Sequence, residues 1–270
     1  MSKQEYNGSE LVVKSLKELN VKYIFGYPGG SVLDLYDALF QQDDIEHILV
    51  RHEQAATHMA DGYARATGEV GVVLATSGPG ATNCVTGIAT AYMDSIPMVV
   101  LSGQVPTNLI GDDAFQETDI VGCSRPIVKH SFNCRSASEI PNILAKAFYI
   151  ASSGRPGPVV LSLPEDMLRD EAEVEDVPMV VPTQTAPTSE QINHIRQLLL
   201  ESKRPLMVLG GGGWNSETCR IFKDFAEQHD LPVTVSFRCQ DRMDNDHRCY
   251  VGDLGIGPNP ELHQLVKDSD

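Results

Sequence analysis

The chain has 270 residues, of which 41% are hydrophobic and 21% are charged, so it is long enough for one large or two ordinary domains with buried cores. Its 37 acidic residues against 21 Lys and Arg give a formal net charge of -16, which argues against nucleic-acid binding. The apolar runs are far shorter than the roughly 20 residues that cross a membrane. The opening MSKQEYNGSE lacks the pattern of a signal or transit peptide, so we predict a cytoplasmic protein without membrane contact.

The cysteines are the first candidates for a disulfide framework or a metal site. All six are widely spaced and no two form a CxxC pair, which favours free thiols in a reducing compartment. Cys239, His247 and Cys249 lie near one another in the sequence, but their spacing matches no zinc pattern and no fourth ligand is evident. No metal site is therefore predicted in this chain.

Residues 1–168 alternate between helical and strand patterns. In chain order the apolar spacing predicts a helix over 9–19, a strand over 23–25, a helix over 33–39, a strand over 48–50, a helix over 53–66, a strand over 71–75, a helix over 81–93, a strand over 98–101, a helix over 140–151 and a strand over 159–163. The strands are apolar on both faces, as in parallel sheets covered by helices on both sides. The predicted fold class is α/β, with a doubly wound parallel sheet.

Residues 169–188 are rich in Asp, Glu, Pro and Thr and follow neither period, so they are predicted to be a linker between two domains, 1–168 and 189–270. In the second domain we expect helices over 191–200 and 217–228, strands over 206–209 and 233–237, and a last helix in ELHQLVKDSD. Two strands are too few for a stable doubly wound sheet, so this domain is expected to be incomplete.

Ligands of open parallel sheets bind beyond the carboxyl ends of the strands, so the residues after each apolar run are candidates for a site. Four such segments are GYPGG at 26–30, RHEQ at 51–54, TSGPG at 76–80 and SGQ at 102–104, and we expect them to converge on one crevice. Each glycine-rich turn alone is also explained by ordinary turn chemistry. Glu53 opens a predicted helix, where the helix dipole alone would stabilise a carboxylate.

The combination of these segments carries a family resemblance. RHEQAATHMADGYARATG, followed closely by VVLATSGPGATN, resembles the pyrimidine-binding domain of thiamine-diphosphate enzymes. With GYPGG, TAYMDSIPMVVLSGQVPTNLIG, DAFQETDIVGCSRPIVKH and SGRPGPVVLSLPED, the chain from Ser9 to Asp166 is most similar to the catalytic subunit of acetolactate (acetohydroxyacid) synthase. The resemblance implies a transferase that joins the hydroxyethyl unit of decarboxylated pyruvate to a second 2-oxo acid, in branched-chain amino acid biosynthesis.

The resemblance also assigns roles to individual residues. It implies that Glu53 bonds the aminopyrimidine of the cofactor and that Gln116 approaches the reacting centre. Residues expected to pack against the pyrimidine are Tyr27, Pro28, Gly29, Thr76, Pro79 and Asn83.

Further matches fall outside the pyrimidine contacts. The resemblance places Phe115 in the substrate pocket, Lys129 near the substrate entrance and Arg155 against FAD. Without it, Phe115 would be interpreted as a core aromatic, Gln116 as an exposed loop amide, Lys129 as a solvated lysine and Arg155 as a cation at the end of a helix.

The second domain resembles the FAD-binding domain of the family less closely. Gly210, Gly211, Gly212 and Asn215 follow a strand and precede a helix, which fits a nucleotide-binding turn and makes FAD a possible cofactor. Downstream, RCQDRMDNDHRCYVGDLGIG departs from the glycine-rich segment usual in the family.

The chain contains neither the Gly-Asp-Gly motif nor the later Asn pair with which this class binds the diphosphate and Mg²⁺, so that site is expected on a missing C-terminal domain. The chain alone is then expected to be inactive. As partners the resemblance implies a small 2-oxo acid, a homodimer or tetramer and a regulatory subunit. Two alternatives stay open: another thiamine-diphosphate decarboxylase, oxidase or carboligase of 2-oxo acids, or a non-catalytic binding fragment.

Overall fold

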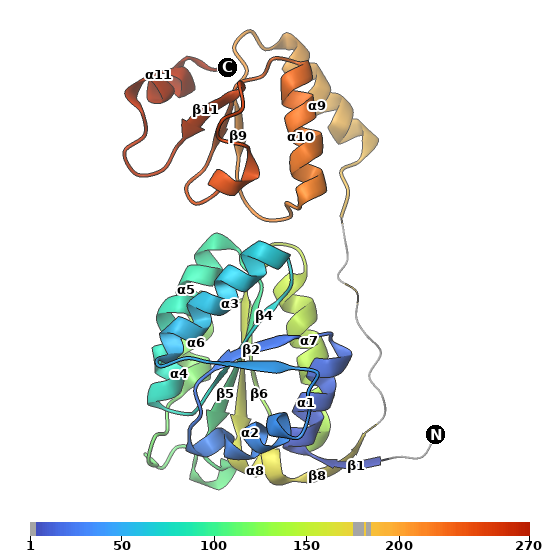
Figure 1. The fold of residues 1–270 in the computed structure, drawn as a ribbon, viewed down its shortest axis with the longest axis vertical. Helices are drawn as coiled ribbons and strands as arrows, with labels where there is room; N and C mark the ends of the chain where they lie inside the picture. Colours follow the sequence, from blue (N-terminus) through green and yellow to red (C-terminus); the bar gives the residue numbers. More distant parts are fainter. Residues whose placement is uncertain (1–3, 175–180, 182–184) are drawn as a thin grey trace. The chain divides into compact units, whose positions relative to one another are not determined.

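The computed structural model describes residues 4–174, 181 and 185–270. The chain divides into two compact units, Met1–Gln184 and Thr185–Asp270, which are described separately below (Figure 1). Part of the predicted linker, 175–180 and 182–184, lies outside the described residues. Its first part is not irregular as expected, because strand β8 (Glu171–Val174) pairs antiparallel with β1 (Gln4–Asn7).

The first unit contains a six-stranded sheet in which every neighbouring pair is parallel, which confirms the α/β prediction. Its strands, in spatial order, are β3 (Glu46–Leu49), β2 (Tyr23–Gly26), β4 (Gly71–Ala75), β5 (Met98–Gln104), β7 (Pro158–Pro164) and β6 (His130–Asn133). Strand β6 is an addition to the prediction. Its sequence, HSFN, is largely polar because it lies at an edge of the sheet, where only β7 pairs with it.

Helices cover both faces of this sheet (Figure 1). One face packs against α1 (Gly8–Glu18), α2 (Leu33–Phe40), α7 (Ile140–Ser152) and α8 (Glu165–Arg169). The other packs against α3 (Glu53–Thr67), α4 (Pro79–Asn83), α5 (Val85–Asp94) and α6 (Ile120–Ser124). The helix predicted over 81–93 is thus two helices, which meet at Cys84.

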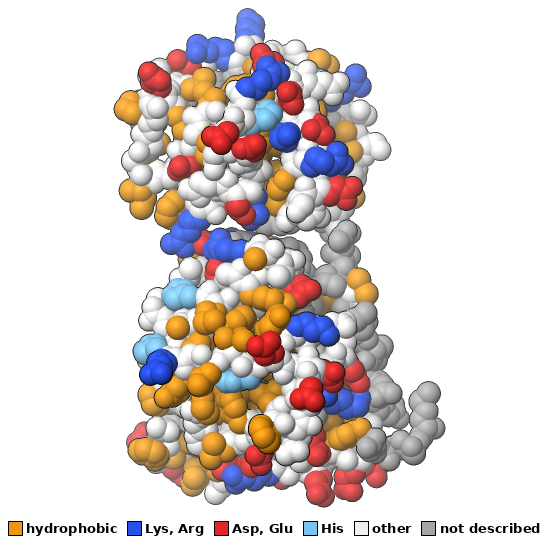
Figure 2. All heavy atoms as spheres, viewed as in Figure 1, with side chains coloured by type: hydrophobic (Ala, Val, Ile, Leu, Met, Phe, Trp, Pro, Cys, Tyr) orange, Lys and Arg blue, Asp and Glu red, His pale blue; other side chains and the backbone are white. Residues whose placement is uncertain are grey.

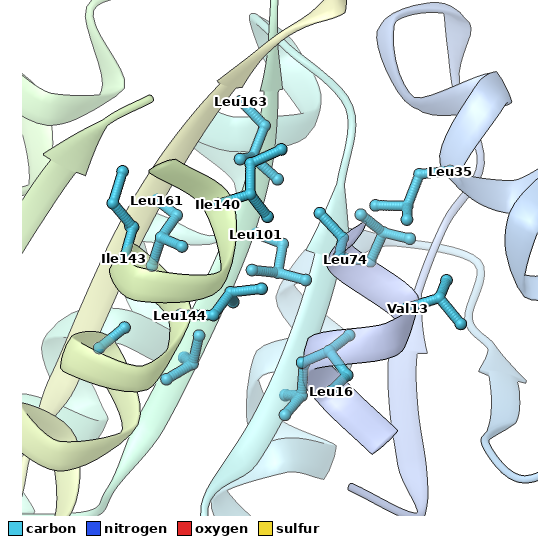
Figure 3. Packing of buried hydrophobic residues seen from close by; sticks show 14 of the residues in the cluster. Val13, Leu16, Leu35, Leu74, Leu101, Ile140, Ile143, Leu144, Leu161 and Leu163 are labelled. Carbon is cyan, nitrogen blue, oxygen red and sulfur yellow. The ribbon is translucent and has the colours of Figure 1, made fainter. Parts of the chain in front are cut away.

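Alternating side chains of the central strands fill two separate cores. On β4, Val72 and Leu74 belong to the first core and Val73 and Ala75 to the second. Figure 3 shows Leu74, Leu101 and Leu161 from adjacent strands facing the helices of the first core. Burial on both faces explains why β4, β5 and β7 are the continuous apolar runs of the sequence.

The second unit has three parallel strands in the order β11 (Tyr250–Asp253), β10 (Val233–Val235) and β9 (Met207–Leu209). Its helices are α9 (Ser189–Glu201), α10 (Ser216–Gln228) and α11 (Pro260–Asp268), as predicted. The expectation of two strands is wrong, because YVGD at 250–253 forms a third strand whose short sequence, containing a glycine and an acid, gives no apolar period.

The strand order of the first unit defines where a ligand would bind. The chain passes from β2 to β3 on one side and then to β4 on the other, so β2 and β4 flank a topological switch point. In open α/β sheets ligands bind at the carboxyl ends of the two strands that flank such a point.

Among the described residues, no helix is long and apolar enough to span a membrane.

Candidate functional site

Three of the four predicted segments lie together at the carboxyl edge of the first unit's sheet. Gly26 ends β2 and leads into Tyr27, Pro28 and Gly29, residues 51–53 follow β3, and residues 76–80 follow β4. The fourth, Ser102–Gln104, is not a turn, because β5 extends through Gln104. A side chain at Gly103 would still collide with Ser31, so this end of β5 contacts the residues that follow β2.

Glu53 is the buried acid of this edge. It is the first residue of α3 and is only 7% exposed. The side-chain amide of Asn83, on α4, donates a hydrogen bond to Oε2 of Glu53 at 2.9 Å. Its Oε1 faces Gly80, where an added Cβ would lie 3.2 Å away. The structure therefore brings Glu53 and Asn83 into direct contact.

The helix dipole alone does not account for Glu53. The N-cap of α3 is His52, whose Nδ1 accepts a hydrogen bond from the backbone N–H of Gln54 at 3.1 Å. A carboxylate that served only the dipole would remain in solvent, because burying an ionised group costs free energy unless it is paired. The burial of Glu53 and its bond to Asn83 indicate a further role.

Thr76 is the centre of a close-packed cradle beside Glu53. Its Oγ1 lies 3.0 Å from Oγ of Ser31, which in turn accepts a hydrogen bond from the N–H of Ser77 at 3.0 Å. A Cβ at Gly29 would lie 2.5 Å from the Thr76 side chain, and one at Gly80 would lie 2.6 Å from it. A side chain at either position would collide with Thr76, so the two glycines let the segments after β2 and β4 pack closely around this side chain.

The other predicted pyrimidine contacts lie on the rim of this cradle. Tyr27 is 41% exposed, and Pro28 and Pro79 are exposed as well. Pro79 is the first residue of α4, a position where its missing N–H costs no helical hydrogen bond. The structure thus brings all seven predicted pyrimidine-side residues, Glu53 included, to one edge.

A loop seats Gln116 at the same edge. Gly78 has φ +55°, and a Cβ there would lie 2.5 Å from the carbonyl oxygen of Gln116, which itself has φ +61°. Phe115, next to it, is 88% exposed, so it is not a core aromatic. The Gln116 side chain is exposed, and its backbone is what packs against Gly78.

Lys129 and Arg155 lie at the opposite, amino-terminal edge of the sheet. Lys129 precedes β6, and its amine donates to the carbonyls of Ile150 and Ser153 at the end of α7. Burial lowers the pKa of this amine. Arg155 precedes β7 and donates to Ser95 Oγ at 2.7 Å and to the carbonyl of Met93, at the end of α5. Within this unit the structure therefore brings neither residue to Glu53, and both interact with the ends of helices.

In the second unit, the predicted glycines follow β9 as expected. Gly210, Gly211 and Gly212 are exposed, and Gly211 has φ +72°. A Cβ at Gly210 would lie 2.6 Å from Oγ of Ser236, just after β10, so a side chain would close this turn. Asn215 is the N-cap of α10 and accepts hydrogen bonds from the N–H and hydroxyl of Thr218. The turn is open, as a nucleotide-binding turn requires, and Asn215 already serves as the N-cap of α10.

Sequence reasoning missed Ser31, although it directly follows GYPGG. Its contact with Thr76 joins residues 45 positions apart, which no local spacing reveals. The described part of the chain has no group of three or more His, Cys, Asp or Glu side chains arranged to hold a metal ion. A hollow of about 330 Å³ between α1 and α2, lined by residues such as Val13 and Gln41, contains none of the predicted site residues.

Comparison with known proteins identifies the class. Residues 6–123 match the family described as "Thiamine pyrophosphate enzyme, N-terminal TPP binding domain", and residues 192–270 match "Thiamine pyrophosphate enzyme, central domain". The chain belongs to the thiamine pyrophosphate enzymes, which confirms the resemblance predicted from the motifs.

Similar individual proteins are acetolactate synthases. The chain is 51% identical over 273 residues to acetolactate synthase isozyme 3 large subunit of Escherichia coli (strain K12), covering 98% of this chain and 47% of that protein. It is 49% identical to the acetolactate synthase large subunit of Haemophilus influenzae, covering 99% of this chain and 48% of that protein. The corresponding protein of Lactococcus lactis is 46% identical, with 98% and 47% covered. The chain thus spans about half the length of the curated relatives it matches.

Proposed function

We propose that this chain supplies the pyrimidine-binding part of a thiamine-diphosphate-dependent acetolactate synthase, a transferase that joins a two-carbon unit from pyruvate to a second 2-oxo acid. The observation that carries the proposal is the buried Glu53, held by Asn83 at the switch point of the sheet. The similarity to acetolactate synthase large subunits supports the choice of reaction.

The residues present fit the ring end of the cofactor. Gly29, Thr76 and Gly80 form a cradle that a single added Cβ would fill, and Glu53 presents an oxygen beside it. Tyr27, Pro28 and Pro79 supply apolar and aromatic surface at the rim, suited to a flat heterocycle. When bound, thiamine diphosphate supplies the acidic thiazolium carbon on which 2-oxo acids are decarboxylated.

Glu53 would hold and move the proton at the aminopyrimidine ring. Its Oε2 already accepts a hydrogen bond from Asn83, so Oε1 is the oxygen that faces the cradle. Asn83 orients the carboxylate, and the buried surroundings exclude water that would compete for the same proton.

Other predicted roles are proposals of the same kind. The exposed Phe115 would contact the substrate, and Gln116 would approach the reacting centre from the loop seated on Gly78. The roles of Lys129 at the substrate entrance and Arg155 at FAD rest on the resemblance alone. FAD itself is proposed for the open turn that contains Gly210, Gly211, Gly212 and Asn215. Mg²⁺ is proposed to bind together with the diphosphate, as the family resemblance implies.

A regulatory subunit is proposed, since the relatives are named large subunits. A homodimer or tetramer is proposed from the family resemblance and from the apolar surface of the first unit. Large hydrophobic side chains are unusually exposed in the first unit, among them Leu49 at 63%, Met93 at 71% and Phe115 at 88%. Figure 2 shows hydrophobic side chains gathered over one face of this unit. Apolar surface gathered on one face, as in Figure 2, marks interaction sites. Sedimentation of the full-length protein as a monomer at micromolar concentration would contradict the assembly. A cytoplasmic location stays a prediction.

The test is Glu53→Gln in the full-length protein. The amide keeps the size and much of the hydrogen bonding of Glu53 but cannot take up the proton. We expect exchange of the cofactor's C2 proton, followed by NMR, to fall by about two orders of magnitude or more. Glu46→Gln, an exposed carboxylate on the preceding strand, is the matched control. Unchanged exchange in Glu53→Gln would remove Glu53 from this role.

A further inference from the structure

A tyrosine and a histidine that no motif singled out form a hydrogen-bonded pair behind the candidate site. Tyr36 lies on α2 and His47 on the edge strand β3, and both side chains are partly buried. The Tyr36 hydroxyl lies 3.0 Å from Nε2 of His47. The two rings pack edge to face, with centroids 4.9 Å apart and an interplanar angle of 84°. The geometry fixes both rings relative to each other.

This pair meets the backbone where β2 and β3 begin to diverge. A Cβ at Gly26 would lie 2.9 Å from the Tyr36 hydroxyl, so the hydroxyl packs directly on the last residue of β2. The carbonyl of Gly26 accepts a hydrogen bond from the N–H of Val50 at 3.0 Å. Gly26 directly precedes the Tyr27 turn, and Val50 lies three residues before Glu53. The pair therefore contacts the point from which both site segments depart.

The protonation states are mutually consistent. Burial lowers the pKa of His47, and a hydrogen bond to the Gly26 backbone opposes this lowering. Burial and the charge of Glu53 both raise the pKa of Tyr36, which keeps its hydroxyl protonated. A neutral imidazole has one donor and one acceptor nitrogen. With its hydroxyl protonated, Tyr36 can donate to Nε2, which places the proton of a neutral His47 on Nδ1.

We propose that Tyr36 and His47 are positioning residues for the cofactor site: the pair clamps Gly26 and thereby sets the separation between the Tyr27–Gly29 turn and Glu53. This rests on the proposed function of Glu53. Neither residue touches the cradle itself, so both act through the backbone of β2 and β3. A shift of about 1 Å in a catalytic group can cost on the order of a hundredfold in rate, so a clamp at this point has a measurable effect.

The first test reads the pair directly in the 270-residue chain. With ¹⁵N-labelled histidine, assigned by loss of a signal in His47→Gln, we expect His47 at pH 7 to be neutral with its proton on Nδ1. Tyr36→Phe should shift the Nε2 resonance. Tyr63→Phe, which removes the hydroxyl that donates to Glu69, should leave it unchanged. An imidazolium, or a proton on Nε2, would overturn the assignment.

The second test separates positioning from fold. In the full-length protein, Tyr36→Phe should slow C2 proton exchange of bound thiamine diphosphate by about tenfold. His47→Gln, whose amide oxygen can still accept from Tyr36, should lose less than His47→Ala, and Tyr63→Phe should behave as wild type. If Glu53→Gln abolishes exchange while Tyr36→Phe stays within twofold of wild type, the pair has no positioning role although the proposed function stands. If Glu53→Gln itself leaves exchange unchanged, the proposed function fails.

Discussion

Gly78→Ala is expected to destabilise the first unit and release the loop that carries Gln116. Gly78 has φ +55° and ψ -117°, a combination that non-glycine residues avoid. Forcing alanine into such a conformation costs about 1 to 3 kcal/mol. The new Cβ would also lie 2.5 Å from the Gln116 carbonyl oxygen, where ordinary contact begins near 3.4 Å. Relieving that overlap costs a further 1 to 3 kcal/mol or so if the loop stays in place.

The expected loss in free energy of unfolding is therefore about 2 to 6 kcal/mol. Gly62→Ala is the matched control, because Gly62 lies inside α3 with nothing within 4 Å of an added Cβ. Alanine is favoured over glycine in a helix by about 1 kcal/mol, so this control should be stabilised. The two substitutions add the same methyl group, and only the backbone conformation and the contact with Gln116 differ.

Urea unfolding of the 270-residue chain measures this difference. Far-ultraviolet circular dichroism follows both units, whereas the single tryptophan, Trp214, reports only the second unit. Gly78→Ala should move the dichroism transition to lower urea and leave the Trp214 fluorescence transition in place. Limited proteolysis should also cut faster near Phe115. A Gly78→Ala transition within error of wild type, with an unchanged cleavage rate near Phe115, would refute the reasoning.

Two other predictions follow from the structure. Burial raises the pKa of Cys84 to about 12 and that of Cys134 to about 11, so above pH 9 the unfolded chain loses thiol protons that the folded unit retains. The first unit should therefore lose stability from pH 9 toward pH 12, and urea midpoints by circular dichroism that stay flat between pH 8 and pH 10 would contradict this. Arg155→Gln should lower stability by about 1 kcal/mol, because Arg155 bonds Met93 and Ser95 at the end of α5. A thermal melt that shows no loss would indicate that Arg155 has no stabilising role there.

The strands whose bounds could be predicted best from the sequence are those buried on both faces, whereas the partly exposed edge strand β3 was predicted at 48–50 and lies at Glu46–Leu49. Residues 71–75 were predicted exactly, because β4 is covered by helices on each side and can contain only apolar residues. Strands β6 and β11 are short, partly exposed and polar in part, so no pattern marks them. The pairing of β1 with β8 joins residues near positions 5 and 173, and its strands QEYN and EAEV have only four residues each, too few for their pattern to predict a strand.

The site divides in the same way. Segments that follow parallel strands converge at one edge of the sheet. The position of Gly29, Thr76 and Glu53 at that edge could therefore be predicted from the strands and the glycines alone. The bond between Asn83 and Glu53 was not, because it depends on how α4 packs beside α3, and only the family resemblance suggested both residues. Neither the strand pattern nor the family resemblance predicted the contact between Tyr36 and His47, because it forms only when α2 packs against the edge strand β3.

Electrostatics decides which end of the proposed cofactor this edge can hold. The acid that faces the cradle is Glu53, and a diphosphate placed there would meet a carboxylate already removed from water, where like charges repel most strongly. The N-terminus of a helix normally attracts phosphate. At the N-terminus of α3, however, the first turn already contains the acidic side chain of Glu53. An aminopyrimidine presents N–H donors, from which a carboxylate accepts, and ring nitrogens, to which the protonated acid can donate. The charge distribution at this edge therefore favours the proposed placement of the pyrimidine ring at Glu53 and disfavours the diphosphate there.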